Sequence, residues 1–308
     1  MGTNKNHSSM DDIIKVENID QYNKLFGFET QHPQVAVVDL SKAEIWPEHF
    51  CFNYGVYCMY LKETRCGEIR YGRQKYDYQE GSIVSFAPGQ TAYVEMERGA
   101  KPSGKGVLFH PDLIRGTALG REIKSYSFLS YDSNEALHLS QRERIIIEDC
   151  FDKISLELET SIDKHSKRLI SRNIELLLDY CLRFYDRQFE TRSEVNKDVI
   201  VRFERLIDEY LADEDLRRGG LPTVGYFADK VCLSPNYFGD LVKKTTGKTP
   251  LEHIQDRLVS LAKDQIAGTS RTFSEIAYDL GFQYSQHFNR FFKKNTGITP
   301  SEYRRMQA

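Results

Sequence analysis

An eight-residue pattern that occurs twice near the end of the chain most strongly limits what this sequence can fold into. The pattern K-K-x-T-G-x-T-P stands at residues 243–250 and again at residues 293–300, each time shortly after a phenylalanine, Phe238 or Phe288. A motif repeated at a fixed spacing indicates two copies of one supersecondary unit. Residues 221–305 are therefore expected to hold two similar helical units.

The first copy is typical of two short helices separated by a tight turn. A helix is expected over Thr223–Val231, and Cys232–Leu233 turns the chain. Ser234 is the expected N-cap of the next helix because its hydroxyl can accept a hydrogen bond from a free backbone N–H, and Pro235 suits the first helical position. Gly247 is the expected end of this second helix.

The second copy repeats this plan. Ser274 is the expected cap of its first helix, and Gly281–Phe282 forms the turn. The second helix is expected over Gln286–Asn295 and ends before the glycine of the repeat. The two copies therefore predict helix-turn-helix units at residues 223–247 and 273–297.

A helix with a steady apolar period connects the two units. It is expected over Leu251–Ala267, which at 1.5 Å per residue spans roughly 25 Å. With its flanking turns, a rod of this length can hold two recognition helices about one DNA turn, roughly 34 Å, apart. A further helix is expected from near Asp198 to about Asp213, ahead of the first unit.

The outward side of the last helix of the second unit carries groups that suit DNA. Gln286 and Asn289 can bond an adenine edge, and Arg290 a guanine edge. Lys293 and Lys294 lie about one turn further on and suit phosphates. The histidine of this helix is assigned to a surface or phosphate contact rather than to metal binding. The DNA-contact candidates here are Ser285, Gln286, His287, Asn289, Arg290, Lys293 and Lys294.

The corresponding helix of the first unit is a weaker reader of bases. Gly239 offers no side chain, and Asp240 repels phosphates, although its carboxylate can accept from cytosine N4 or pair with a nearby lysine. Looser, water-mediated readout is expected from this unit. The paired lysines also fit a solvated helix end favoured by the helix dipole. The DNA-contact candidates here are Asn236, Tyr237, Asp240, Lys243 and Lys244, of which Tyr237 also counts among the inward side chains.

Residues 199–306 resemble the AraC/XylS family of transcriptional regulators. The resemblance implies a bacterial, cytoplasmic regulator that binds double-stranded operator DNA through two helices in successive major grooves. RNA polymerase is a further candidate partner. The motif residues that carry the resemblance are Ile276, Ala277, Gly281, Phe282, Phe288, Arg290, Phe292, Lys293, Lys294, Gly297, Thr299, Pro300, Tyr303 and Arg304.

The distribution of charge agrees with a nucleic-acid module at the end of the chain. The whole chain has a net charge of −3, with 42 Lys and Arg against 45 Asp and Glu. Residues 223–308 carry 12 basic against 8 acidic side chains, which leaves 30 against 37 for the rest. A basic segment on an acidic body is the direction expected for DNA binding.

The first half has a different pattern, with short apolar strands followed by two helices. Strands separated by turn residues predict a sandwich or small barrel. From about Ser140 the apolar period becomes helical, over Gln141–Glu159 and Ser166–Phe189, and either helix can close the core or pair with a second subunit. The strand candidates are Val35–Leu40, Phe52–Leu61, Glu68–Tyr71, Ile83–Phe86 and Ala92–Glu97, with a turn-rich stretch at Gly99–Gly106.

The segment Gly81–Gln90 resembles a cupin strand-turn-strand segment. The chain is therefore expected to be an α+β protein of two domains. The first is a β-rich, cupin-like barrel with a helix pair, and the second is an all-α domain with two helix-turn-helix units. The expected boundaries are a flexible segment 1–20, a sensing or dimerisation domain 21–189, a linker 190–198 and a DNA-binding domain 199–308.

An unknown small-molecule effector and a second copy of the chain are the expected partners of the first domain. Aromatic side chains with polar tips suit the wall of a small-molecule site, although ordinary core packing is the simpler account of them. The ligand-binding candidates are Tyr54, Tyr57, Tyr60, Tyr76, Tyr78 and Trp46.

No enzymatic activity, cofactor, metal or membrane contact is expected. The eight histidines form no H-x-H pair, and the six cysteines form no C-x-x-C pair. These absences disfavour the alternative of a DNA-binding module fused to a metal-cupin or alkyl-transfer domain. No apolar run approaches the roughly 20 residues that cross a bilayer.

Overall fold

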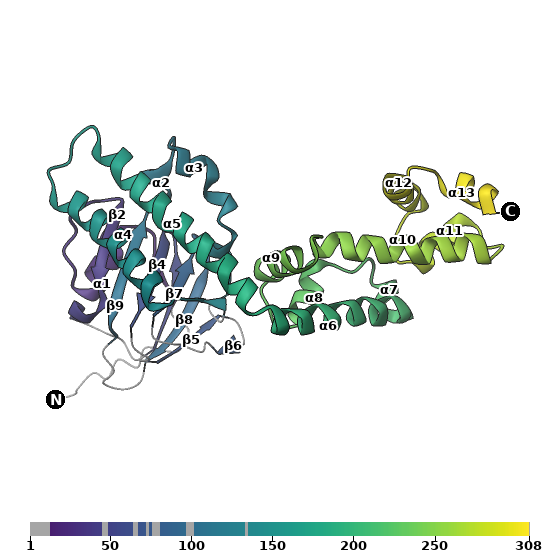
Figure 1. Cartoon of the computed structure of the whole chain (residues 1–308), viewed down its shortest axis with the longest axis horizontal. Coiled ribbons are helices and arrows are strands. Elements are labelled where there is room, and N and C mark those ends of the chain that lie inside the picture. The colour runs from purple at the N-terminus through teal and green to yellow at the C-terminus, as the bar shows by residue number, and fades with distance from the viewer. Residues whose placement is uncertain are drawn as a thin grey trace, which may run out of the picture. The chain divides into compact units, whose positions relative to one another are not determined.

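The computed structural model describes residues 13–44, 49–63, 67–71, 74–75, 81–96, 102–132 and 135–307. The chain divides into two compact units, Met1–Glu190 and Thr191–Ala308 (Figure 1). The first contains the described strands and the second is built from helices. The expected α+β protein with a β-rich first part and an all-helical second part is therefore confirmed.

The described strands of the first unit form two five-stranded sheets. One sheet has the order β1-β3-β8-β5-β6 and the other the order β10-β7-β4-β9-β2. Among the described strands, β1 and β3 pair in parallel and the other pairs are antiparallel. The strands are β1 (Ile13–Val16), β2 (Val35–Asp39), β3 (His49–Tyr54), β4 (Tyr57–Lys62), β5 (Gly67–Tyr71), β6 (Gln74–Lys75), β7 (Ser82–Phe86), β8 (Thr91–Met96), β9 (Gly104–Phe109) and β10 (Leu137–His138).

Two strand predictions are wrong for reasons that involve glycine. The single strand expected over Phe52–Leu61 is two strands, β3 and β4, which belong to different sheets. The break falls at Gly55, where a Cβ atom would lie only 3.1 Å from the Cα of Glu17. The end of the stretch expected to be turn-rich forms the start of β9, and there a Cβ on Gly106 would lie 2.6 Å from the ring of Tyr60. Glycine therefore serves close packing within a strand at this position.

Part of the segment expected to be flexible is ordered in the first sheet. β1 pairs with β3 from Ile13 onward. Helix α1 (Ile19–Phe26) follows, with the Asn18 side chain accepting from the backbone N–H of Gln21 and Gly27 ending the helix at φ +76°. The boundary at residue 20 is therefore wrong for its last residues, and residues 1–12 lie outside the described part.

The apolar core of the first unit lies between the two sheets and beneath α1. It combines aromatic and aliphatic side chains from both sheets, among them Phe52, Tyr60, Phe86 and Leu108. Short helical segments follow β9: α2 (Pro111–Ile114), α3 (Ala118–Glu122), η2 (Ile123–Ser125) and η3 (Ser127–Ser130), while η1 (Leu40–Lys42) follows β2.

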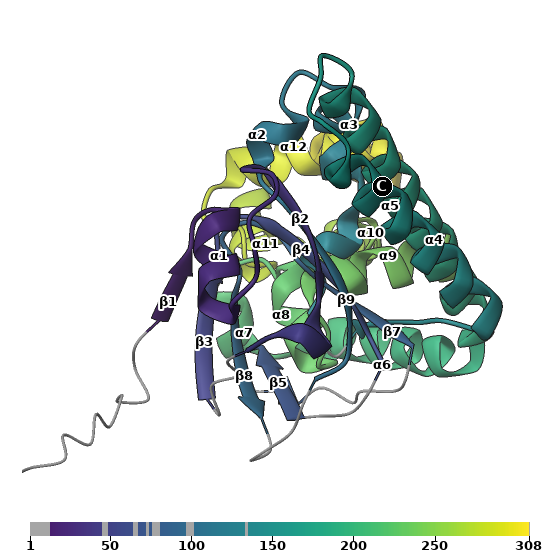
Figure 2. The ribbon, with the colours of Figure 1, turned by 90° about the vertical axis from the view of Figure 1, so that its left-hand side faces the viewer.

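The two long helices expected in the first unit are present as α4 (Gln141–Glu159) and α5 (Ser166–Thr191). Ser140 begins α4 with a reciprocal capping box, in which its hydroxyl accepts from the N–H of Glu143 and the Glu143 carboxylate accepts from the N–H of Ser140. Figure 2 shows α4 and α5 together along one side of the unit, and α4 contacts β2 and β9. The helix pair therefore covers part of the second sheet.

The linker expected over residues 190–198 is helical except at its third residue. α5 continues to Thr191 and α6 (Ser193–Ala212) begins two residues later, so only Arg192 separates them. Residues 190–198 are mostly polar and therefore show no apolar period, which is why a linker was expected. Glu, Lys and Arg are nevertheless good helix formers.

The second unit contains α6 and seven further helices within the described residues. These are α7 (Glu214–Arg218), α8 (Val224–Lys230), α9 (Pro235–Thr246), α10 (Pro250–Gly268), α11 (Phe273–Asp279), α12 (Ser285–Thr296) and α13 (Pro300–Gln307). Figure 1 shows α10 as the long central element of this unit. α9, α11, α12 and α13 all contact it.

Candidate nucleic-acid interface

The first helix-turn-helix unit consists of α8 and α9, and its local signals act as expected. The Thr223 hydroxyl caps α8, and the Ser234 hydroxyl accepts from the N–H of Tyr237 at 3.2 Å with Pro235 in the first turn. Cys232 in the intervening turn has φ +62°. Gly247 ends α9 in the left-handed region at φ +79°, where a residue with a Cβ atom would be strained.

A cluster of aromatic rings fixes α9 against α6, α8 and α10. Phe203 of α6 lies 5.3 Å from the ring of Phe227 and 4.9 Å from that of Phe238, and all three side chains are fully buried. His253 of α10 closes the cluster, and its Nε2 lies 2.9 Å from the Thr246 hydroxyl at the end of α9. The inward face of α9 is therefore used for packing, which leaves the opposite face to solvent.

The second helix-turn-helix unit consists of α11 and α12, and the cap of α11 differs from the prediction. Thr272 rather than Ser274 begins α11, because Glu275 stands three residues after Thr272 and completes a capping box with it. The backbone hydrogen bond from Thr272 also lowers the pKa of the Glu275 carboxyl. α12 begins at Ser285, one residue earlier than expected, and Gly297 ends it at φ +84°.

The second helix-turn-helix unit has its own apolar core, to which the last half of α10 contributes. Phe288 and Phe292 of α12 are fully buried and pack with Ile276 of α11 and with Ala262 and Ile266 of α10. The Phe292 ring also lies 5.6 Å from that of Tyr303 in α13. α10 therefore contributes to the packing of both units.

The outer face of α12 carries the predicted side chains in exposed positions. Ser285 is half-buried, and the other six candidates are exposed: Gln286, His287, Asn289, Arg290, Lys293 and Lys294. α12 has three cationic side chains and no acidic one along its length. Amide, guanidinium and ammonium donors on one exposed face match the acceptors of a DNA major groove and its phosphates.

The outer face of α9 is less rich in such groups. Asn236, Lys243 and Lys244 are exposed and Asp240 is half-buried. A Cβ atom added to Gly239 would meet nothing within 4 Å. Tyr237 is only 5% exposed. Its inclusion among the DNA-contact candidates is therefore corrected, because a buried side chain supports the core of the unit and presents no group to DNA.

Two exposed tyrosines of the second helix-turn-helix unit were missed by sequence reasoning. Tyr284 directly precedes α12 and is 58% exposed, with its ring 5.3 Å from that of His287. Tyr278 near the end of α11 is 61% exposed. A large aromatic residue next to a DNA-contacting helix is itself a candidate for DNA contact. Whether such a residue is exposed depends on how α11 packs, which the sequence pattern does not give.

The repeat also contains a pair of helix caps that the sequence reasoning passed over. Thr249 and Glu252 form a capping box at the start of α10, and Thr299 and Glu302 make the same contacts at the start of α13. In both, the backbone hydrogen bond from the threonine lowers the pKa of the glutamate. The signal was the sequence T-P-x-E, which follows each glycine of the repeat at the same distance.

The tyrosines expected to line an effector site have different surroundings from one another. Tyr54 and Tyr60 are buried in the core around Phe86, whereas the half-buried Tyr57 stacks on Phe109 at 4.8 Å. Burial raises the pKa of the Tyr60 hydroxyl far above its usual value. Trp46, Tyr76 and Tyr78 lie outside the described residues. The structure thus brings Tyr54 and Tyr60 together and separates Tyr57 from them.

A surface cavity of about 570 Å³ lies along β2 in the first unit. Five consecutive residues, 35–39, line it, and because side chains alternate along a strand, the backbone of β2 must form part of its wall. β2 is the last strand of its sheet. The fully buried Asn23 also lines the cavity, and its Oδ1 atom has no hydrogen-bond partner.

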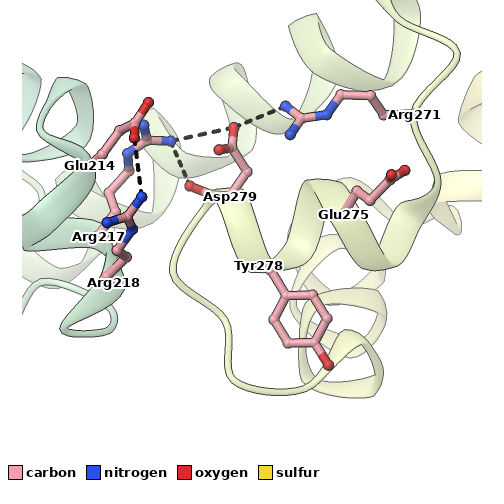
Figure 3. A pocket seen from close by; sticks show the side chains of 7 residues that line it. All are labelled: Glu214, Arg217, Arg218, Arg271, Glu275, Tyr278 and Asp279. Atoms are coloured by element: carbon pink, nitrogen blue, oxygen red, sulfur yellow. Dashed lines mark hydrogen bonds and ion pairs between the residues drawn. The ribbon is translucent and has the colours of Figure 1, made fainter.

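A second cavity, of about 500 Å³, lies in the helical unit between α7 and α11 (Figure 3). Its lining combines basic and acidic side chains. Arg217, Arg218 and Arg271 face it together with acidic residues of the same two helices, Glu214, Glu275 and Asp279. Equal numbers of cations and anions do not favour a charged ligand, so the importance of this region lies in the contacts among its own residues.

Within the described part of the chain, no helix combines the length and apolar character needed to cross a membrane.

Comparison with known proteins agrees with the two helix-turn-helix units. A family described as a helix-turn-helix domain matches residues 227–306. The transposon Tn10 TetD protein of Escherichia coli is 34% identical over 145 residues, which cover 47% of this chain and 91% of TetD. A solved structure, the C-terminal domain of the response regulator yesN from Fusobacterium nucleatum, is 26% identical with a TM-score of 0.31, covering 35% of this chain and 98% of that one.

One relative matches both halves of the chain. The HTH-type transcriptional regulator YijO of Escherichia coli K12 is 30% identical over 226 residues, which cover 73% of this chain and 76% of YijO. The match extends well beyond the helical unit, so the likeness is not confined to a shared DNA-binding module. The chain therefore belongs to the AraC/XylS family of DNA-binding transcriptional regulators.

Proposed function

We propose that α9 and α12 enter successive major grooves on one face of operator DNA, and that α12 supplies most of the sequence specificity. The observation that carries this proposal is the exposed face of α12, which presents Gln286, Asn289 and Arg290 while Phe288 and Phe292 hold the opposite face in the core. α10 has 19 residues and is therefore about 28 Å long. This length suits two helices set about one DNA turn apart.

Each group on α12 has a role that follows from its chemistry. Gln286 and Asn289 donate to and accept from adenine edges, and Arg290 donates to guanine O6 and N7. Lys293 and Lys294 contact phosphates. Ser285 and His287 lie at the start of the helix, where short side chains and ring nitrogens reach the DNA backbone. These contacts set both register and base preference.

α9 contributes weaker readout. Asn236 offers one amide, Lys243 and Lys244 suit phosphates, and Gly239 leaves a gap in the middle of the helix face. The half-buried carboxylate of Asp240 is unfavourable beside phosphates but can accept from cytosine N4. We therefore expect broader base tolerance in the half-site that α9 contacts.

We further propose that the first unit senses a small effector. The cavity along β2 supports this, because its volume falls within the range of small-molecule sites and Asn23 Oδ1 offers it an unsatisfied acceptor. The buried Tyr54 and Tyr60 remain candidates only if an effector enters the core between the sheets. Titration of the full chain with candidate metabolites, read by thermal shift for the native protein and Asn23→Ala, tests this site.

A homodimer formed through the two long helices is the second proposed role of the first unit. Leu169 and Leu176 of α5 are exposed and lie two helical turns apart on one face, and Leu156 of α4 is 63% exposed. Exposed leucines at a seven-residue spacing match a helix seam. Sedimentation of the full chain should show a dimer that Leu176→Glu dissociates, and a strictly monomeric native chain at high concentration would contradict it.

We propose no enzymatic activity for this chain. Burial raises the pKa of the Cys150 thiol to about 11 and raises that of Cys51, Cys58 and Cys181. Thiols kept protonated in this way are poor nucleophiles. Two of the relatives are named as regulators. By analogy with them, the chain would act on DNA in the cytoplasm, and RNA polymerase is a further candidate partner.

The proposed docking is tested with duplexes selected from a random DNA pool by the native protein. Affinity should fall steeply as salt rises, because several phosphate contacts release counterions. Arg290→Ala should cost about 1–3 kcal/mol and relax preference at one base pair. Arg205→Ala, which removes an exposed arginine from α6, serves as the control and should leave the selected sequence unchanged.

Two results would contradict the docking. A flat salt response would remove groove binding altogether. An unchanged base preference in Arg290→Ala, with weakened binding in Arg205→Ala, would place the DNA on another face of the unit.

A further inference from the structure

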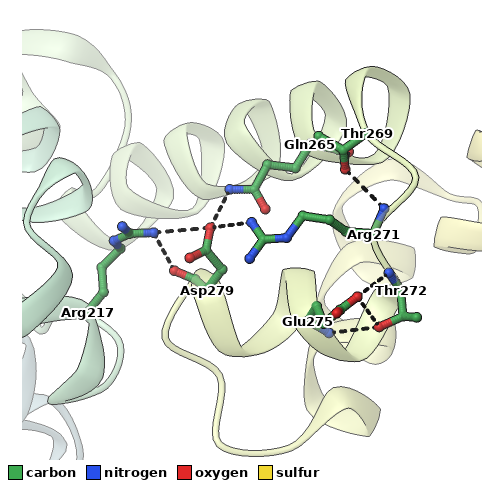
Figure 4. A network of polar contacts seen from close by, with 7 residues as sticks. All are labelled: Arg217, Gln265, Thr269, Arg271, Thr272, Glu275 and Asp279. Carbon is green, nitrogen blue, oxygen red and sulfur yellow. Dashed lines mark hydrogen bonds and ion pairs between the residues drawn. The ribbon is translucent and has the colours of Figure 1, made fainter.

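A polar cluster connects the segment between α6 and α8 with the first helix of the second helix-turn-helix unit. Asp279, the last residue of α11, lies at its centre (Figure 4). Its Oδ2 atom accepts from Gln265 Nε2 at 2.9 Å and from Arg271 Nη1 at 3.3 Å, and it pairs with Arg217 Nη1 at 3.4 Å. Arg217 Nη1 also donates to the backbone carbonyl of Asp279 at 2.6 Å. One residue thus connects α7, α10 and α11.

The backbone of the same two segments is in close approach. A Cβ atom on Gly281, at the turn after α11, would lie 2.9 Å from the carbonyl oxygen of Gly220 and 3.1 Å from that of Arg217. Tyr210 of α6 donates its hydroxyl to the same Gly220 carbonyl at 3.2 Å. The contact therefore continues from α11 through residues 217–220 to α6, which packs with α9 through Phe203.

The Arg217–Asp279 pair differs from the exposed ion pairs elsewhere in this unit. The Arg217 side chain is 14% exposed and that of Asp279 28%, whereas the neighbouring pair of Arg218 and Glu214 is 75% and 73% exposed. Exposed pairs contribute little because water and salt screen them. A shielded, directional pair fixes the angle between its helices more firmly than apolar packing does, because apolar contacts have no preferred direction.

We propose that Asp279 and Arg217 are positioning residues that set the spacing and rotational phase of α9 and α12 on DNA. The inference rests on the proposed docking of these two helices. Without the cluster, α10 would be the connection between the two helix-turn-helix units, and a single helix can bend and twist along its length. The cluster adds a second connection, from α11 through residues 217–220 to α6 and its contact with α9. Two connections hold the recognition helices at one separation.

The functional consequence is discrimination between operators that differ only in half-site spacing. One base pair inserted between the half-sites moves one groove by about 3.4 Å and turns it by about 35° around the DNA axis. A pair of units held at two points cannot follow this displacement, whereas a pair joined only by α10 adapts more readily.

The test uses the full chain and duplexes selected from a random pool, together with the same duplexes lengthened or shortened by one base pair between the half-sites. The native protein should lose about tenfold or more in affinity for either altered duplex. Asp279→Asn removes the negative charge of the pair with little change in shape, and Arg217→Gln removes its positive charge. Both variants should lose only about threefold on the altered duplexes, while a duplex with the α12 half-site alone binds them as it binds the native protein.

Glu214→Gln is the matched control. It removes a carboxylate that lines the same cavity but makes only an exposed ion pair. Its spacing profile should equal that of the native protein. The double variant Arg217→Asp with Asp279→Arg, which reverses the pair, should recover part of the native discrimination.

The outcomes separate the two proposals. A native protein that discriminates spacing, with both single variants discriminating equally, overturns the positioning role and leaves the docking intact. A native protein indifferent to spacing overturns both. Equal weakening on every duplex, half-site included, shows that the cluster only stabilises the fold, and this too overturns the positioning role.

Discussion

Two glycines in equivalent left-handed conformations provide a sharp test of the contact between residues 217–220 and the second helix-turn-helix unit. Gly281 has φ +90° and Gly297 φ +84°. Alanine at either position pays for a left-handed backbone, about 1–2 kcal/mol. At Gly297 nothing lies within 4 Å of the added Cβ, whereas at Gly281 the Gly220 carbonyl oxygen lies 2.9 Å away. Backbone must then move, at a further cost of about 1–3 kcal/mol.

We therefore expect Gly297→Ala to destabilise the helical unit by about 1–2 kcal/mol and Gly281→Ala by about 2–5 kcal/mol. Hydrogen-exchange mass spectrometry of the full chain measures the free energy of local opening for α11 and α12 without requiring the two units to unfold together. In Gly281→Ala, protection should also fall in residues 210–220. Equal effects of the two substitutions, or a loss of protection confined to α11 and α12, would refute the described contact.

Three further predictions concern the helical unit. Thr299→Ala should cost about 0.5–2 kcal/mol by removing the cap of α13, with Thr299→Ser as control, measured by scanning calorimetry. The folded pKa of Glu302 lies below the usual 4.5, so the stability that this carboxylate contributes is present above pH 4.5 and is lost as the pH falls through the lowered pKa. Glu302→Gln should therefore reduce the fall of the unfolding temperature in acid. An unaltered fall would contradict this. Phe292→Ala should cost about 3–5 kcal/mol in denaturant unfolding, because the ring is fully buried; a loss below about 1 kcal/mol would contradict the described core.

The helical unit was predictable in detail because its local signals agree with one another. Ser234, Pro235 and Gly247 mark the ends of α9, and the repeat predicts the same plan around α12. The wrong cap at Ser274 came from weighing residue type without the glutamate three positions further on. A capping box needs both partners, and Thr272 with Glu275 has them.

The strands were predicted less well because glycine has more than one use. Gly55 was read as part of a continuous strand but separates β3 from β4, and Gly106 was read as a turn but lies within β9 beneath Tyr60. Both positions depend on atoms distant in sequence, Glu17 in one case and the Tyr60 ring in the other. A local pattern contains no information about such contacts.

The exposure of most candidate residues was predictable from the sequence, whereas the contacts that support their helices were not. The helical period separated exposed from buried positions on α12 correctly, whereas Tyr237 on α9 is buried despite its place among the candidates. The cluster around Asp279 joins residues 62 positions apart. No periodicity or motif pairs Arg217 with Asp279, because the turn at Gly281 brings them together only in the folded unit.

In the proposed docking, the contrast between the outer faces of α9 and α12 would give each bound copy of the chain a polarity along the double helix. One end of this footprint would be chemically demanding and the other permissive, so the DNA contacted by one copy would have a head and a tail. Reversing such a site relative to a promoter would turn the whole regulator around without altering its affinity. Orientation thereby becomes a variable that selection can tune independently of binding strength, and genome searches for its targets should use a directional matrix.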